Sequence, residues 1–153
     1  MDKPNFVYVT YIKTSAEKLW RALTSSEFTT QYWFGTRWES DWKTGSACRA
    51  YDGDGKLTLT GEVLQSNPFT RLSYTFHNEK AGLAHEAASR VTYELAVEGD
   101  VVKLTVLHDG FEPGSAVFQA ISQGWPKVLS GLKSLLETGA ACTIPHTCSV
   151  EQK

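Results

Sequence analysis

The stretch SAVFQAISQGWPKVLSGLKSLLETG, residues 115–139, decides the fold of this chain. Its apolar residues recur at alternating steps of three and four, which is the spacing of one face of an α-helix. The main members of this face are Phe118, Ile121, Trp125, Val128, Leu132 and Leu135. A helix of this length with one apolar face must pack against a large apolar surface, and we expect the preceding sheet to supply it.

Three residues inside this predicted helix do not favour helix formation. Gly124 and Gly131 each cost about 1 kcal/mol relative to alanine. Pro126 cannot donate a hydrogen bond to the carbonyl of Ser122, whose hydroxyl falls on the apolar face. Two explanations stay open, namely a kink solvated by a buried water and a ligand contact inside a cavity.

Residues 36–109 alternate between apolar and polar side chains, with turn sequences at regular distances. Six strands of an antiparallel meander fit between these turns. The turn at residues 52–55 faintly resembles a calcium loop but lacks the later glutamate of such loops, so we predict a hairpin. The apolar positions, which we expect to face the helix, are Leu57, Leu59, Val63, Leu72, Tyr74, Phe76, Val91, Tyr93, Leu95, Val97, Val102, Leu104 and Val106.

The N-terminal part predicts one strand and two short helices. Residues 6–13 are rich in β-branched and aromatic side chains, and both faces of this strand are partly apolar, which suits a strand covered on two sides. Thr14 precedes Glu17 by three residues and Thr24 precedes Glu27 by three, which predicts two capping boxes. The expected class is α+β, a helix-grip fold in which a curved antiparallel sheet of about seven strands wraps around the long C-terminal helix.

Length and composition indicate one domain over residues 1–139, followed by a flexible tail at 140–153. The formal net charge is −2 and the basic residues are scattered, so we expect neither nucleic acid nor a membrane as a partner. The chain shows no signal peptide and no apolar run of membrane-spanning length. We therefore expect a cytoplasmic protein, and the sequence leaves monomer and homodimer open.

The three cysteines do not form a disulfide framework, because their number is odd and Cys48 is far from the other two. Cys142, His146 and Cys148 lie close together in the tail, but their spacing matches no usual zinc pattern. We expect no metal site and no cofactor.

Seven segments along residues 6–138 carry a family resemblance. They are VYVTYIKTSAEKLWRALT at 7–24, YWFG at 32–35, ESDWKTGS at 39–46, GEVLQSNPFTRLSYTFH at 61–77, SRVTYEL at 89–95, LTVLHDGF at 104–111 and GWPKVLSGLKSLLETG at 124–139. In these segments the chain resembles the SRPBCC superfamily, the START-related group with the birch-pollen-allergen fold, and within it the branch similar to the C-terminal domain of the activator of heat-shock protein 90 ATPase. The resemblance implies an apolar or amphipathic small molecule held between sheet and helix, cyclase or hydrolase activity in some members, and docking on a chaperone in the activator branch.

The leading hypothesis is a pocket that binds a small hydrophobic or aromatic molecule. We expect His108, Ser122 and tyrosine hydroxyls to orient the ligand. The alternative is that these aromatic side chains form an ordinary core. The candidate walls are Trp33, Phe34, Trp38, Tyr74, Phe76, Tyr93, Phe118 and Trp125.

Two other functions are compatible with the sequence. One is a chaperone-activator-like interaction module that uses a surface patch. The other is a pocket enzyme with His108 as general acid or base, although a lone inward histidine is more often a hydrogen-bonded core residue. No Gly-x-Ser-x-Gly, His-Glu-x-x-His or phosphate-binding glycine loop supports chemistry.

Overall fold

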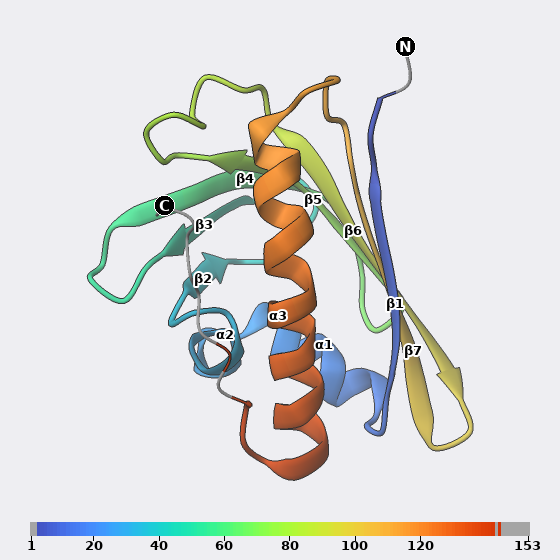
Figure 1. Cartoon of the computed structure of the whole chain (residues 1–153). Coiled ribbons are helices and arrows are strands. Elements are labelled where there is room, and N and C mark those ends of the chain that lie inside the picture. The colour runs from blue at the N-terminus through green and yellow to red at the C-terminus, as the bar shows by residue number, and fades with distance from the viewer. Residues whose placement is uncertain (1–2, 143, 145–153) are drawn as a thin grey trace.

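The computed structural model describes residues 3–142 and residue 144. Seven strands form one antiparallel sheet in the order β1-β7-β6-β5-β4-β3-β2, and α3 packs across it (Figure 1). The predicted α+β helix-grip fold is therefore confirmed. The elements are β1 (Phe6–Ile12), α1 (Ala16–Thr24), α2 (Ser26–Tyr32), β2 (Arg37–Ser40), β3 (Ala47–Tyr51), β4 (Leu57–Asn67), β5 (Arg71–Asn78), β6 (Ser89–Glu98), β7 (Val101–Asp109) and α3 (Ala116–Thr138).

Helix α3 is capped at both ends. At its start the hydroxyl of Ser115 accepts a hydrogen bond from the Phe118 amide at 3.0 Å, and Glu86 Oε2 accepts one from the Ala116 amide at 2.8 Å. At its end Gly139 adopts φ 90°, a left-handed conformation that favours glycine. The predicted apolar face is buried against the sheet, apart from Phe118, which is half-buried. Its buried members are Val117, Ile121, Trp125, Val128, Leu129, Leu132, Leu135 and Leu136.

The two glycines inside α3 have different surroundings. A Cβ atom on Gly131 would lie 3.3 Å from the Cβ atom and the carbonyl oxygen of Tyr32, so this glycine lets α2 pack closely on α3. A Cβ atom on Gly124 would meet no atom within 4 Å. The close approach of α2 is a structural reason for Gly131, whereas Gly124 faces open space.

The inner face of the sheet is close to the predicted one, because the strands keep the alternation of side chains that the sequence shows. Leu57 and Val97 are the exceptions, with 36% and 64% of their surfaces exposed. Each lies next to a turn, Leu57 as the first residue of β4 and Val97 one residue before the end of β6.

Strand β4 approaches β5 very closely at Gly61. A Cβ atom at this position would lie 1.9 Å from the carbonyl oxygen of Thr75, which no side chain tolerates. In the same place the hydroxyl of Thr75 accepts a hydrogen bond from the Glu62 amide at 2.8 Å. Only glycine allows β4 to take this path across β5.

The prediction that the first strand is covered on two sides was wrong. Strand β1 forms one edge of the sheet, beside β7. Its outward side chains Val7, Val9 and Tyr11 are 56%, 45% and 46% exposed, since no layer covers the outer face of the strand. The apolar outer face therefore remains on the surface of the described chain.

The two predicted capping boxes were also wrong. Helix α1 is capped by Ser15, whose hydroxyl accepts a hydrogen bond from the Lys18 amide at 3.1 Å, one residue later than predicted. The hydroxyl of Thr14 is instead buried with no partner among the described residues. Helix α2 begins after Ser25 and has no side-chain cap, because it follows α1 without a loop. Within the described part of the chain, no helix is long and apolar enough to cross a membrane.

Candidate ligand-binding site

A cavity of about 320 Å³ lies between α3 and the ends of strands β2 to β5. This volume is at the lower end of the range for sites that hold small molecules. Helix α3 contributes only apolar groups to the cavity, whereas the strand ends contribute most of its polar groups. The lining residues are Trp33, Phe34, Thr36, Asp52, Thr58, Leu59, Phe76, Asn78, Lys80, Ala120, Ile121, Gly124, Trp125 and Val128.

The aromatic wall near α2 depends on a tight turn. The Thr36 amide donates to the Trp33 carbonyl at 2.8 Å, and Phe34 and Gly35 both adopt positive φ, 50° and 74°. This left-handed conformation is unusual for a phenylalanine. The turn brings the Trp33 ring against Trp125 of α3, with the ring centroids 5.1 Å apart.

Four of the predicted site residues line the cavity, namely Trp33, Phe34, Phe76 and Trp125. Three others, Trp38, Tyr74 and Tyr93, do not line it and are at most 3% exposed. The Trp38 ring packs 5.7 Å from Trp33, and the hydroxyls of Tyr74 and Tyr93 lie 3.0 Å apart. Burial raises the pKa of both tyrosines well above the ordinary value of about 10. These three aromatic residues form the core behind the cavity wall.

Phe118 and Ser122, also predicted for the site, do not line the cavity. The Ser122 hydroxyl donates to the carbonyl of Phe118 within α3 at 2.7 Å. The Phe118 ring packs on Phe111, with 5.3 Å between the centroids. The hydroxyl on the apolar face of α3 is thus satisfied by its own helix rather than by a group in the cavity.

His108 is fully buried behind Trp125 and is bonded through both ring nitrogens. The Trp125 indole N–H donates to Nδ1 at 3.0 Å, so the proton of the neutral ring is assigned to Nε2. Nε2 lies 2.7 Å from the Ser89 hydroxyl, which in turn donates to the Phe76 carbonyl at 3.2 Å. The three hydrogen bonds form a continuous chain from α3 to β5.

The surroundings of His108 hold its ring neutral. Burial lowers the pKa of His108 to about 3, and the nearby charge of Asp109 opposes this only in part. The ring does not line the cavity, and neither nitrogen is free to exchange a proton with a molecule bound there. This geometry is that of a positioning residue for Trp125 and does not suit general acid or base catalysis.

The polar side of the cavity was not predicted from the sequence; it consists of Thr36, Asp52, Thr58, Asn78 and Lys80. These residues lie at or next to the ends of β2, β3, β4 and β5. In the sequence they lie in turns or at polar strand positions, so nothing distinguishes them from ordinary surface residues. Only the register of the strands brings them together, since Arg37 pairs with Tyr51 and Leu59 with Asn78.

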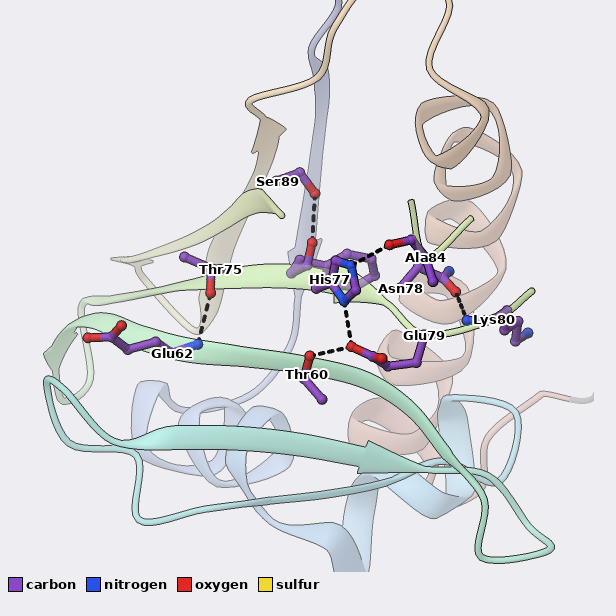
Figure 2. Close-up of polar contacts among 10 residues, drawn as sticks. Thr60, Glu62, Thr75, His77, Asn78, Glu79, Lys80, Ala84 and Ser89 are labelled. Carbon is purple, nitrogen blue, oxygen red and sulfur yellow. Dashed lines mark hydrogen bonds and ion pairs between the residues drawn. The ribbon is translucent and has the colours of Figure 1, made fainter. Parts of the chain in front are cut away.

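A hydrogen-bonded cluster fixes the loop that leaves β5 (Figure 2). His77 Nδ1 lies 2.5 Å from Glu79 Oε2, and His77 Nε2 lies 2.9 Å from the carbonyl oxygen of Ala84. The hydroxyl of Thr60 donates to the same Glu79 oxygen at 2.7 Å. Hydrogen bonding to Glu79 and to Ala84 raises the pKa of His77 above its ordinary value.

The turn at residues 52–55 is bonded as a hairpin. Asp52 Oδ1 accepts hydrogen bonds from the amides of Asp54 and Lys56 at 2.9 and 3.0 Å, as expected for a hairpin turn rather than a calcium loop. Among the described residues no group of three potential ligands lies together. Cys142 is exposed, and His146 and Cys148 lie outside the described residues.

A curved antiparallel sheet around a long C-terminal helix, with an aromatic cavity between them, defines a helix-grip protein of the SRPBCC superfamily. The chain belongs to the family described as Activator of Hsp90 ATPase homolog 1-like protein, whose model matches residues 13–137. No protein with curated annotation matches the chain.

Three solved structures illustrate the similarity. Protein MLL2253 from Mesorhizobium loti is 27% identical with a TM-score of 0.75, over 87% of this chain and 96% of that one. The Aha1 dimer from Colwellia psychrerythraea is 18% identical with a TM-score of 0.72, over 89% and 98% of the two chains. PFC0360w, an HSP90 activator from Plasmodium falciparum, is 19% identical with a TM-score of 0.71, over 86% and 95%. The latter two resemble this chain in fold alone.

Proposed function

We propose that this protein binds a small hydrophobic or aromatic molecule in the cavity between α3 and the sheet. The observation that carries the proposal is the cavity of about 320 Å³ with four aromatic residues, Trp33, Phe34, Phe76 and Trp125, on its walls. Aromatic walls with a few polar groups are typical of small-molecule sites. The unfilled space beside Gly124 supports the same function, because a side chain at this position in α3 would fill part of the cavity.

The experiment is a binding screen in which the cavity can be filled by mutation. Compounds from panels of aromatic acids, flavonoids and lipids are titrated into the protein, and heat and tryptophan fluorescence are recorded, since two tryptophans line the cavity. We expect at least one compound class to bind the wild type and to lose most of its affinity for Gly124→Leu. Gly124→Ala, which adds a single methyl group, is the matched control and should bind more strongly than Gly124→Leu. The absence of heat and of a fluorescence change with every compound would refute the proposal.

A second candidate function is docking on a chaperone of the heat-shock protein 90 type. Membership of the activator-like family supports it, as does the similarity in fold to PFC0360w, an HSP90 activator. A surface suited to a protein partner is the apolar outer face of β1, where Val7, Val9 and Tyr11 are exposed.

An ATPase assay distinguishes this second candidate from the first. If the chain is an activator, it stimulates the ATPase of a chaperone of the heat-shock protein 90 type, and Val9→Lys reduces this stimulation while unfolding at the same temperature as the wild type. Ala47→Lys, at an exposed position of β3 that is distant from β1 in the sheet, adds the same charge and is the control. An unchanged ATPase rate at saturating protein argues against chaperone activation and leaves ligand binding untouched.

A further inference from the structure

The polar and apolar groups of the cavity lie on different sides. Helix α3 presents Ala120, Ile121, Gly124, Trp125 and Val128 to the cavity. None of these side chains offers it a hydrogen bond, since the Trp125 indole N–H already donates to His108. The strand ends present Thr36, Asp52, Thr58, Asn78 and Lys80. A ligand that satisfies both sides has an apolar body with a polar group at one end.

Three of the five polar residues offer free hydrogen-bond donors. The hydroxyl of Thr36, a residue only 8% exposed, has no hydrogen-bond partner among the described residues. Asn78 Oδ1 already accepts a hydrogen bond from the Lys80 amide at 2.9 Å, which leaves the Asn78 NH₂ group as a donor (Figure 2). The Lys80 ammonium has no carboxylate within 4.0 Å in the part of the chain that the structure describes.

The other two polar residues are bonded within the sheet or its turn. The Thr58 hydroxyl uses its hydrogen to donate to the Ala50 carbonyl at 3.3 Å, so only its oxygen, an acceptor, is left for the cavity. Asp52 is the only carboxylate among the lining residues, and its Oδ1 atom accepts two backbone hydrogen bonds from its own turn. The hydrogen bond from the Lys56 amide is the main cause of the lowered pKa of Asp52. Oδ1 therefore serves the hairpin, and the charge of Lys80 also contributes to the lowered pKa of this carboxylate. The unused donors that face the cavity are those of Thr36, Asn78 and Lys80, and the Lys80 ammonium carries a positive charge.

We propose that the natural ligand is an apolar carboxylic acid whose carboxylate binds at Lys80, Asn78 and Thr36. Its ring system lies between Trp33, Phe76 and Trp125, where only apolar contacts are available. A carboxylate offers acceptors without donors, which matches one ammonium, one amide NH₂ and one hydroxyl. The inference rests on the proposed ligand-binding function and specifies the ligand class.

The test uses three compounds that share one ring system, at pH 7.5. They are 2-naphthoic acid, 2-naphthalenemethanol and 2-naphthylmethylamine, which carry a negative, a neutral and a positive group. We expect the acid to bind about tenfold more tightly than the alcohol, the effect of one charge-assisted hydrogen bond at a partly exposed site. The amine should bind most weakly.

Two variants test whether Lys80 supplies the positive charge that binds the carboxylate. In Lys80→Gln the acid should bind no more tightly than the alcohol, because the affinity for the acid falls by more than that for the alcohol. Lys56→Gln, an exposed lysine of the neighbouring hairpin that does not line the cavity, should retain the full preference for the acid. Circular dichroism and the unfolding temperature show that both variants are folded.

The outcomes separate this inference from the function on which it rests. Equal affinities for acid and alcohol overturn the carboxylate site and leave the cavity as an apolar binding site. Tightest binding of the amine overturns it in favour of Asp52 as the anchor. An acid preference that survives in Lys80→Gln overturns the assignment to Lys80. If none of the three compounds binds while other apolar compounds do, only the carboxylate inference fails. If no compound of any panel binds, the proposed ligand-binding function fails as well.

Discussion

His77 and Glu79 lie 2.5 Å apart on β5 and the loop that follows it, and the opposite ring nitrogen of His77 also faces an acceptor, the carbonyl oxygen of Ala84. A neutral imidazole has only one N–H group, so it cannot donate to both acceptors. The geometry is satisfied only by the protonated ring, in agreement with its raised pKa. Residues 79–84 are therefore held to the sheet by a positive charge.

The first prediction concerns the pH dependence of this loop. Because the folded state raises the pKa of His77, its contribution to stability is complete below the ordinary value near 6.5 and is lost as the pH rises through the raised pKa. An NMR titration should place the midpoint of His77 above 6.5. Amide exchange of residues 79–84, corrected for its intrinsic pH dependence, should accelerate across the same interval.

His85→Gln is the control for this titration, since His85 is an exposed histidine in the same loop and makes no hydrogen bond to the sheet. It should leave the exchange profile unchanged, whereas His77→Gln should remove the pH-dependent acceleration. A midpoint of His77 at or below 6.5 would show that the ring is not held in its protonated form.

The second prediction compares two glycines of one helix. Replacement of a helical glycine by alanine stabilises a helix by about 1 kcal/mol. Gly124→Ala should raise the free energy of unfolding by up to that amount, because its surroundings are open. Gly131→Ala should gain less or lose stability, since its Cβ atom would crowd Tyr32 at 3.3 Å. Urea unfolding measures both, and equal effects would contradict the packing of α2 on α3 described above.

The third prediction concerns the contact between β4 and β5. Gly61→Ala should destabilise the protein by more than about 2 kcal/mol, because the new methyl group overlaps the Thr75 carbonyl and the backbone must move. Gly53→Ala, in an exposed turn with nothing within 4 Å, should change the stability by less than about 0.5 kcal/mol. Similar melting temperatures for the two variants would refute the close approach.

The fourth prediction concerns acid stability. His108 has a lowered pKa of about 3 in the folded state, so the stability that its neutral ring provides is complete above its ordinary value near 6.5 and is lost as the pH falls from there toward 3. In that interval the unfolded chain binds one proton more than the folded chain. The free energy of unfolding of the wild type should then fall more steeply than that of His108→Gln, by about 1.4 kcal/mol per pH unit. Parallel pH profiles from pH 6 to 4 would mean that the buried ring accepts a proton.

Much of the fold follows from local patterns in the sequence. The period of residues 115–139 and the alternation in residues 57–106 predicted α3 and the inner face of the sheet, since burial on one side imposes these repeats directly. The open outer face of β1 was not predictable in this way, because an edge strand differs from a central strand in its neighbours rather than in its own residues.

The candidate site was predicted only in part for a related reason. Aromatic residues identified the apolar walls through Trp33, Phe34, Phe76 and Trp125, but periodicity cannot separate a cavity wall from the core behind it. The inward direction of His108 followed from its parity with Val106, whereas its partner Ser89 is 19 residues away and is found only from the pairing of β6 with β7. Lys80 and Asp52 line the same cavity because of the strand register, and no short segment of the sequence encodes that register.

The hydrogen bonds from Trp125 through His108 and Ser89 to the Phe76 carbonyl join the two opposite walls of the cavity. They act as a spacer of fixed length between helix and sheet, because each member is buried and bonded on both sides. The separation of these two walls is thereby set by His108 and Ser89, which do not themselves line the cavity. A ligand that pushes the helix away from the sheet has to stretch these hydrogen bonds, whereas one that fits the existing separation leaves them intact.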